Sequence, residues 1–448
     1  MDSASPVTTS PEEERDSDIA NGPASDERSR APAPHLATRG KLSSYGLLLH
    51  VGEQTLETRY GKFQAHVFRN LHTRTHALAV CRGDIQTSKT LLARVHSACI
   101  TSETFGACDC DCAEQLDLAL ACIAEAERGV VFYLMQEGRG AGYAAKARDR
   151  MIVQSSGHTV TTFDAYKKLG LDPDYRRYSE VALSLRLLGV SAPLRLLTNN
   201  PEKLRALEEH GVAVASAERI QSEASPFNVH YLSTKRGVGH ALAGSSLDER
   251  GAELPEPVHS FEPTPLEGAP YLVKMASYLL PLRVGGSGAF AWFRAHVYFD
   301  LLAGCERVVL THGEAARGER PAPLVRIQHE SLFERFPVQN GVNKRQWRTT
   351  VVEMVRHGHG VAVFPSADGH DDLLVASVLG ARPRRERALA GRIADEALFV
   401  LLEHHVPGKV LTPVVTSLDD PACSRVVSEE LDRHGFSLGT STLLDLSA

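Results

Sequence analysis

The sequence contains little cysteine, no long apolar run and no excess of basic residues. Its eight cysteines in 448 residues cluster instead of spreading along the chain, which argues against a disulfide framework. No apolar run approaches the roughly 18 residues that suggest a membrane span. The formal net charge of −6 provides no basic field for a polynucleotide. We therefore expect neither a membrane protein nor a nucleic-acid partner, and local arginines and lysines must hold any anionic ligand.

The beginning of the chain has no pattern of a signal peptide. Residues Met1 to Pro6 contain neither a basic region nor an apolar core, which favours a cytoplasmic, reducing location. The first 43 residues are mostly Ser, Pro, Asp, Glu, Arg and Ala. Because such a segment cannot offset its ordering entropy by burial, we predict a disordered tail over residues 1–43.

The length of the chain predicts two domains in addition to this tail. With 43% apolar and 23% charged residues, the composition is that of a globular protein. Residues 241–270 are rich in Gly, Ser, Glu and Pro, which predicts an interdomain linker. One domain would then occupy residues 44–240 and the other residues 271–448.

Strand-like and helix-like patterns alternate within residues 44–240. This alternation predicts the α/β class, with α+β mixed sheets and flanking helices. Strands are expected at residues 64–68, 77–80, 91–95, 130–134 and 194–197. Helices are expected at residues 115–126, 144–154, 179–188 and 202–210.

Three cysteines, Cys99, Cys110 and Cys112, are spaced as metal ligands. Three thiolates can hold Zn²⁺ and leave the fourth tetrahedral position for water, which is the geometry of a catalytic site. The alternative is that these cysteines are buried small hydrophobic residues, but their clustering favours a metal. Isolated cysteines are expected to be core residues: Cys122, Cys305 and Cys423.

Residues Gln136 to Gly142 form a glycine-rich segment between an expected strand and an expected helix. Such a segment can be a purely structural turn, because glycine readily adopts positive φ. Its position before a helix also allows backbone N–H groups to bind an anion. Arg139 adds a planar donor fork that suits phosphate, so we predict an anion-binding loop.

Five segments occur in the order and near the spacing of a known family: residues 94–115, 136–140, 174–176, 196–203 and 230–235. Over about residues 60–240 the chain resembles GTP cyclohydrolase II. The resemblance implies a hydrolase in which Zn²⁺, held by Cys99, Cys110 and Cys112, activates water to attack C8 of the guanine ring of GTP. It further implies release of pyrophosphate and formate, a place in riboflavin biosynthesis, and homodimers.

The resemblance also implies the roles of individual residues. Asp174 matches the proton acceptor of the family, and Arg176 matches the residue that attacks the α-phosphorus, although a protonated arginine would instead clamp the phosphates. Residues that match nucleotide-binding positions are Arg94, Val95, His96, Ser97, Gln115, Glu137, Gly138, Arg139, Thr162, Thr198 and Lys203. Gln115 and Glu137 would read the guanine base, and Mg²⁺ would accompany the triphosphate. By local chemistry alone, residues 174–176 could be a solvated turn and residues 198–203 a strand end with a helix cap.

Several residues depart from the family pattern. Ala98 replaces the usual glutamate, and Asp109 replaces an arginine. Cys108 adds a fourth thiol, which would close the open zinc position if it were a ligand. Arg150 or Met151 stands where the family has a tyrosine, and neither supplies a phenol. If that tyrosine assists the loss of formate, ring opening would stop at the formamide.

The second half of the chain repeats the order of segments in the first half. Residues 294–298 echo 64–68, 324–331 echo 92–99, 357–364 parallel 126–133, and 410–421 parallel 196–201. We therefore predict tandem cyclohydrolase II-like domains. Ser331, Val342 and Lys344 stand at or near the ligand positions of the second copy, so this copy is expected to be degenerate. It could replace a homodimer partner and make an intrachain pseudo-dimer.

Two other functions stay open at this point. One is a paralogous cyclohydrolase-like enzyme of pyrimidine (uracil) catabolism, which the altered residues around Cys99 and Met151 keep in view. The other is a non-catalytic nucleotide-binding protein. Turnover of GTP, compared with UTP and uracil derivatives, would separate the three possibilities.

Overall fold

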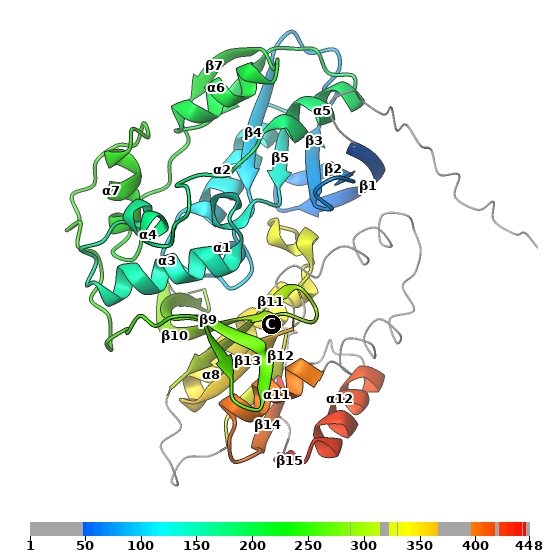
Figure 1. Cartoon of the computed structure of the whole chain (residues 1–448). Helices are drawn as coiled ribbons and strands as arrows, with labels where there is room; N and C mark the ends of the chain where they lie inside the picture. Colours follow the sequence, from blue (N-terminus) through cyan, green and yellow to red (C-terminus); the bar gives the residue numbers. More distant parts are fainter. Residues whose placement is uncertain are drawn as a thin grey trace, which may run out of the picture. The chain divides into compact units, whose positions relative to one another are not determined.

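The computed structural model describes residues 48–286, 288–313, 322–328, 330–365, 396–416, 421–440 and 442–444. Within these ranges the chain forms two mixed β-sheets with flanking helices (Figure 1), which confirms the predicted fold class. The predicted tail over residues 1–43 lies outside the described residues. No helix in the described ranges combines the length and apolar character that a membrane span requires.

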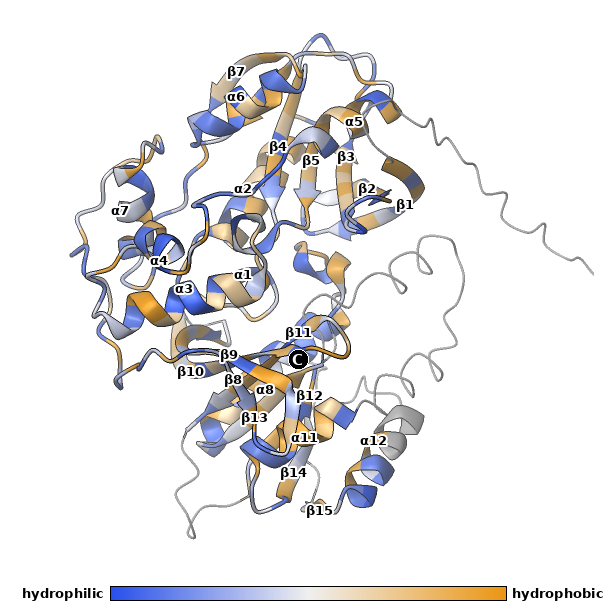
Figure 2. Ribbon diagram, viewed as in Figure 1, coloured by the Kyte–Doolittle hydropathy of each residue, from blue (hydrophilic) through white to orange (hydrophobic). Residues whose placement is uncertain are grey.

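The first sheet has the strand order β1-β2-β3-β5-β4-β6-β7. Its antiparallel part consists of β1 (Leu48–Thr58), β2 (Gly61–Asn70) and β3 (His76–Arg82), and β3 pairs with β5 (Gly129–Leu134). Its parallel part adds β4 (Leu91–Ser97), β6 (Leu194–Leu197) and β7 (Val214–Glu218). Strands β3, β4 and β5 are buried almost throughout, in keeping with their hydrophobic sequences (Figure 2).

The helices of this half connect the strands of the sheet. They are α1 (Ile100–Glu103), α2 (Cys112–Glu125), the short 3₁₀ helix η1 (Glu137–Gly140), α3 (Tyr143–Ser155), α4 (Thr162–Lys168), α5 (Ser179–Leu187), α6 (Pro201–Glu209) and α7 (Val229–Gly237). Every strand and helix expected from the sequence in this half is present, with ends within three residues of the expected ones.

The second sheet repeats the topology of the first. Its strands are β8 (Thr264–Leu266), β9 (Ala269–Val284), β10 (Ala289–Asp300), β11 (Cys305–His312), β12 (Leu324–Ile327), β13 (Gly360–Phe364), β14 (Val410–Thr416), β15 (Ser437–Leu438) and β16 (Thr442–Leu444). The order β9-β10-β11-β13-β12-β14-β15 reproduces that of β1 to β7, and each pairing has the same parallel or antiparallel sense. The sequence echoes fall on equivalent strands, such as β2 with β10 and β4 with β12.

The described helices of the second half are η2 (Leu332–Arg335), α8 (Val342–His357), α11 (Glu396–His405) and α12 (Pro421–Arg433). The predicted linker, residues 241–270, contains β8, and Val258 within it is only 5% exposed. Part of this range is therefore folded against the core. The domain boundaries themselves stay predictions.

Helix α3 packs between the two copies. Tyr143 and Met151 on α3 share one hydrophobic core with Leu280 on β9. The hydroxyl groups of Tyr143 and Tyr278 are 2.9 Å apart, and the Gln154 side chain hydrogen-bonds both the N–H and the C=O of Leu279, each at 2.8 Å. The copies thus share an interior, not only a linker.

Candidate active site

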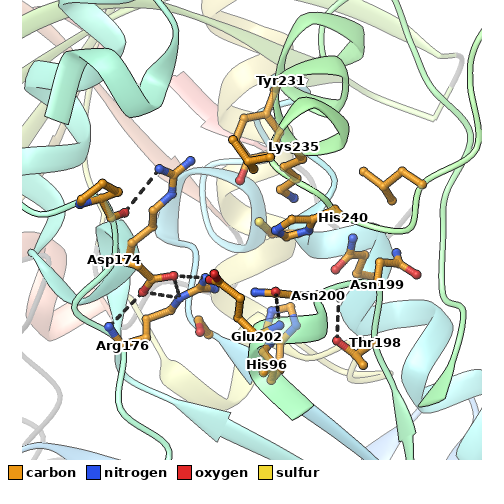
Figure 3. Close-up of a pocket in the computed structure, with 18 of the residues that line it drawn as sticks. His96, Asp174, Arg176, Thr198, Asn199, Asn200, Glu202, Tyr231, Lys235 and His240 are labelled. Carbon is orange, nitrogen blue, oxygen red and sulfur yellow. Dashed lines mark hydrogen bonds and ion pairs between the residues drawn. The ribbon is translucent and has the colours of Figure 1, made fainter. Parts of the chain in front are cut away.

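A cavity of about 290 Å³ lies beyond the carboxyl ends of the parallel strands β4 and β6, where α/β proteins commonly bind ligands. Among the residues that line it are nine of those predicted from the sequence (Figure 3): Arg94, His96, Ser97, Gln115, Arg139, Asp174, Arg176, Thr198 and Lys203. Cys112 of the thiol triplet also lines the cavity. Segments far apart in the chain therefore meet at one site.

Four predicted nucleotide-binding residues do not line this cavity. Val95 offers only its carbonyl, which accepts from Lys203 Nζ at 2.8 Å. The Gly138 carbonyl accepts from the Tyr166 hydroxyl at 2.8 Å. Thr162 donates to Asp149 Oδ2 at 2.7 Å, and Glu137 is engaged beside the thiols. Their ligand-binding roles stay predictions.

Other residues in the cavity wall were not assigned roles from the sequence: Phe163, Pro173, Asn199, Asn200, Glu202, Tyr231, Lys235, Val238, His240 and Leu242. Asn199 and Asn200 lie in the matched segment 196–203, and Tyr231 and Lys235 lie in the segment 230–235, so the sequence did contain a signal for them. His240 follows α7 and had no such signal.

Three buried atoms in the cavity wall lack a hydrogen-bond partner: Arg94 Nε, His96 Nδ1 and Ser97 Oγ. Buried polar atoms in folded proteins are almost always paired with protein, water or ligand. Arg94 is otherwise well held, since its Nη1 donates to the Leu197 carbonyl at 2.8 Å and its Nη2 contacts Gln115. The free donor and acceptor positions therefore point to a polar ligand.

The three sulfur atoms of Cys99, Cys110 and Cys112 lie within 4.8 Å of one another. Cys99 Sγ and Cys110 Sγ are 3.7 Å apart, close to the roughly 3.8 Å between two ligands of a tetrahedral zinc with Zn–S bonds of about 2.3 Å. Cys112 is also the first residue of α2, and a helix N-terminus favours a thiolate. The donor set and its spacing fit zinc.

Buried charges surround the thiols. Lys146 Nζ is 3.2 Å from Cys99 Sγ and donates to Glu137 Oε1 at 2.7 Å. Hydrogen bonds from the Cys110 and Cys112 thiols, together with the Lys146 ammonium, lower the pKa of Cys99. Asp111 accepts from Lys235 Nζ at 2.8 Å. Two ammonium groups thus offset the negative charge that three thiolates would carry.

Cys108 lies outside the thiol triplet. Its Sγ is directed at the Gly106 carbonyl, 3.8 Å away, and burial raises the pKa of its thiol to about 11. Within the described residues it does not belong to the group of converging sulfur atoms. The arrangement leaves the fourth ligand position free of Cys108.

Asp174 and Arg176 form a two-pronged ion pair in the cavity wall (Figure 3), with Arg176 Nε 2.9 and 3.0 Å from the two carboxylate oxygens. Burial opposes the charge on Asp174, but the bonds and charge of Arg176 outweigh it and lower the pKa of Asp174. Gly140 positions this segment: its φ is +84°, and a Cβ there would lie 3.0 Å from the Tyr175 backbone. Only glycine suits this approach.

The cavity is strongly basic. Burial lowers the pKa of Arg94 to about 10. Burial and the neighbouring Arg94 and Arg176 lower the pKa of Lys203 well below its ordinary value. Burial and the charges of Lys235 and Arg176 lower the pKa of His240 to about 4. Repulsion of Lys203 by Arg94 and Arg176 favours binding of a polyanion.

The residues that depart from the family pattern are also placed by the structure. Asp109 Oδ2 lies 3.4 Å from Arg150 Nη2, and the Arg150 guanidinium lies 5.0 Å from the centre of the Tyr231 ring. Met151 is fully buried in the core shared by the two copies. Neither Arg150 nor Met151 lines the 290 Å³ cavity.

A buried hydrogen-bond chain connects the cavity with the second copy. His96 Nε2 and Glu103 Oε1 are 2.7 Å apart, and the Tyr133 hydroxyl donates to Glu103 Oε2 at 2.5 Å. Arg335 on η2 donates to the Tyr133 oxygen at 3.1 Å and forms an ion pair with Glu330. The second copy therefore orients a residue of the cavity wall.

Comparison with known proteins gives a consistent result for the first copy. The sequence profile of GTP cyclohydrolase II matches residues 49–221. A GTP cyclohydrolase-2 of Tolumonas auensis is 39% identical over 193 residues, which cover 43% of this chain and 96% of that protein. The riboflavin biosynthesis protein RibBA of Endomicrobium trichonymphae is 37% identical over 46% of this chain and 52% of its own length. The chain thus spans about half of this RibBA relative.

Among solved structures, RibBX, a two-domain 3,4-dihydroxy-2-butanone 4-phosphate synthase from A. baumannii, has 18% identity over 43% of this chain and 42% of its own. Its TM-score of 0.23 supports no statement about the fold.

Proposed function

The chain belongs to the GTP cyclohydrolase II family, and we propose that its first copy, residues 44–240, is a zinc-dependent hydrolase that opens the imidazole ring of GTP and releases pyrophosphate. Family membership makes the protein a hydrolase of cyclic amidine C–N bonds. One observation carries the proposal: Arg94, His96 and Ser97, each with an unpartnered buried polar atom, line the same cavity as Cys112 of the thiol triplet.

The basic side chains of the cavity suit a triphosphate. Arg94, Arg139 and Lys203 are proposed to hold the phosphates, because they line the cavity and the charge of Arg94 contributes to lowering the pKa of Lys203. Arg176 is paired with Asp174, which raises the pKa of its guanidinium. A guanidinium so firmly protonated is a poor nucleophile, so the geometry favours Arg176 as a clamp on the phosphates.

Asp174 would then orient Arg176 through two hydrogen bonds. Its lowered pKa makes it a weak base, and its role as proton acceptor stays a prediction. His96 is an alternative group that could accept a proton from the ligand. Its Nδ1 has no hydrogen-bond partner, whereas its Nε2 is hydrogen-bonded to Glu103. The Glu103 carboxylate thus fixes the ring so that Nδ1 is available to the cavity.

Cys99, Cys110 and Cys112 are proposed to hold Zn²⁺. When bound, zinc supplies Lewis-acid chemistry that makes water a stronger nucleophile. Lys146 and Lys235 would offset the charge of the thiolates, since they contact Cys99 and Asp111. Mg²⁺ with the triphosphate stays a prediction that follows only from the expected substrate.

The product is proposed to retain the formyl group. Arg150 is engaged by Asp109 and Met151 is in the core, so neither reaches the cavity or offers a phenol for a second hydrolysis. Quantitative assay of formate and pyrophosphate from the same reaction tests this point. One formate for every pyrophosphate would contradict it.

The shared interior supports a pseudo-dimer within one chain. Two observations support it: the strand order is repeated, and buried hydrogen bonds connect His96 to Arg335 of the second copy. We propose that the second copy takes the role of a partner subunit in orienting the site. Sedimentation of the purified protein would show a monomer if the second copy replaces a partner, and a dimer if it does not.

The substrate is tested by incubation with GTP and, separately, with UTP and uracil derivatives. We expect loss of purine absorbance and release of pyrophosphate with GTP alone. Turnover of UTP or a uracil derivative would favour the enzyme of pyrimidine catabolism. Bound zinc and bound GTP without turnover would favour a non-catalytic nucleotide-binding protein.

A further inference from the structure

A second, smaller cavity of about 50 Å³ is enclosed by both copies of the domain. Its polar wall comes from the first copy and includes Asp109, Arg150, His158 and His230. Its apolar wall includes Phe227, together with Pro281 and Trp292 of the second copy. No role has been assigned above to this cavity, and it differs from the basic cavity in charge and size.

Four buried atoms of this polar wall lack a hydrogen-bond partner: Asp109 Oδ1, Arg150 Nε, His158 Nδ1 and His230 Nε2. Asp109 is only 8% exposed. Leaving one buried donor or acceptor unpaired is costly, and native proteins keep few such atoms. Their concentration around a single cavity indicates that a polar ligand completes the hydrogen bonding there.

The chemistry of the four atoms restricts this ligand. The ionised Asp109 carboxylate only accepts hydrogen bonds, whereas Arg150 Nε only donates. The two residues form an ion pair with an Nη2–Oδ2 distance of 3.4 Å, so their charges cancel. Burial lowers the pKa of His158 to about 4 and the pKa of His230 below its ordinary value, and a neutral imidazole can donate or accept. The ligand must therefore be neutral and carry a donor beside an acceptor.

The size of the cavity restricts the ligand further. About 50 Å³ admits roughly three or four water-sized groups, at about 10–15 Å³ for each. Phe227 and Trp292 supply aromatic surfaces, with ring centres 5.9 Å apart, against which a flat group can pack. An amide is flat, neutral and of this size, and it has an N–H donor beside a carbonyl acceptor.

We propose that this cavity binds a small neutral amide, whose carbonyl oxygen accepts a hydrogen bond from Arg150 Nε and whose N–H donates to Asp109 Oδ1. A larger molecule with an amide edge would project through the mouth of the cavity. Tyr231 lines this cavity and the basic cavity alike, so the bound amide contacts a residue of the nucleotide site. The proposal does not depend on GTP being the substrate.

Formamide and formate provide a matched pair of probes, because they have the same number of non-hydrogen atoms but only formamide is neutral and has an N–H. Saturation-transfer NMR on the full chain can follow the C–H proton of each. We expect formamide to bind saturably with a Kd in the millimolar range, because the binding free energy of a ligand with three non-hydrogen atoms is limited to about that value. Formate should bind at least about tenfold more weakly, because the cancelled ion pair offers no net charge to offset the desolvation of an anion and formate has no N–H for Asp109.

Substitutions of the cavity residues test whether formamide and formate bind in this cavity. Asp109→Asn leaves the charge of Arg150 uncancelled and weakens the acceptor at position 109, so formamide should lose and formate should gain affinity. Arg150→Gln should weaken both probes. Arg250→Gln is the matched control, because Arg250 lies on the rim of the same cavity but is already paired with the exposed Asp248, and this variant should bind formamide as the wild type does.

The wild-type comparison needs no variant and can overturn the proposal by itself. Equal affinity for formamide and formate would contradict it. Absence of saturable formamide binding, with only ordered water in crystals of the full chain, would also contradict it. Formamide binding that is unchanged in both Asp109→Asn and Arg150→Gln would place the amide elsewhere.

Discussion

Asp109 and Arg150 form an ion pair in which Oδ2 and Nη2 are 3.4 Å apart, and Asp109 directly precedes Cys110, one of the three cysteines proposed to hold zinc. Asp109 stands where the family pattern has an arginine, and Arg150 or Met151 stands where it has a tyrosine. The Arg150 guanidinium supplies a positive charge beside position 109, where the family's arginine is absent. Both side chains are mostly buried: the side chain of Asp109 is 11% exposed and that of Arg150 is 13% exposed.

Removal of either member of this pair should destabilise the protein. Asp109→Ala and Arg150→Ala each leave a mostly buried charge without its partner, at a cost of about 3 kcal/mol. The double variant should cost less than the sum, with a coupling of about 1 kcal/mol or more. Urea unfolding of the wild type, the two single variants and the double variant measures this coupling. Strict additivity would show that the pair does not contribute as a unit.

Zinc binding should distinguish Cys110 from Cys108. Cys110→Ser removes one of the three converging sulfur atoms, whereas Cys108 is directed away from them. We expect one zinc per chain in the wild type and in Cys108→Ser, and loss of zinc in Cys110→Ser, by elemental analysis. Equal loss in both variants would contradict the three-ligand assignment.

Arg335 should affect the active site from the second copy. Arg335→Met removes the positive charge that is paired with the buried Glu330, and it removes the hydrogen bond to Tyr133. We therefore expect lower stability, by about 3 kcal/mol, and a lower kcat for GTP. Arg335→Lys restores the charge and should recover part of both losses.

The control for Arg335 is Arg356→Met. Arg356 also pairs with a glutamate, Glu353, but it is 71% exposed, and surface pairs contribute little. We expect a change within about 0.5 kcal/mol and an unchanged kcat. If Arg335→Met leaves kcat unchanged in folded protein, the hydrogen-bond chain to His96 has no role in turnover.

Acid should destabilise the second copy through His405. Burial, with His404 and Lys274 nearby, lowers the pKa of His405 to about 3, whereas in the unfolded chain it is about 6.5. The unfolded state therefore binds more protons between these values. Stability from this site is fully present above about pH 6.5 and is lost as the pH falls towards 3.

The melting temperature should accordingly fall on acidification, and more steeply in the wild type than in His405→Gln, which can keep the 2.8 Å hydrogen bond to Tyr298. His72→Gln, at an exposed turn, should follow the wild-type profile. A wild-type profile in His405→Gln would assign the acid sensitivity to other groups.

The sequence predicted those parts of the site that depend on local pattern. The strands at 91–95 and 194–197 were recognisable because their side chains are almost all apolar, and the cysteine spacing alone indicated a metal. The orientation of side chains could not be predicted in this way. Glu137 matches a base-reading position, yet its carboxylate accepts from Lys146 and from the Ile100 N–H. The sequence alone did not show the Lys146 ammonium or the Ile100 N–H to be partners of Glu137.

Contacts between segments far apart in the chain could not be predicted from the sequence either. Lys235 contacts Asp111 from α7, and Arg335 reaches Tyr133 from the second copy. The repeated motifs indicated a duplicated domain, but only the fold shows that the copies share one core around α3. The pairing of Asp109 with Arg150 also depends on that packing.

We propose that the first copy uses a three-cysteine zinc site to open the ring of GTP. The most direct test is to measure pyrophosphate release from GTP by the zinc-loaded full chain, with Cys108→Ser and Cys110→Ser assayed beside it. We expect one pyrophosphate for each GTP consumed by the wild type and by Cys108→Ser, and none with Cys110→Ser. Zinc-loaded protein that binds GTP without releasing pyrophosphate would contradict it.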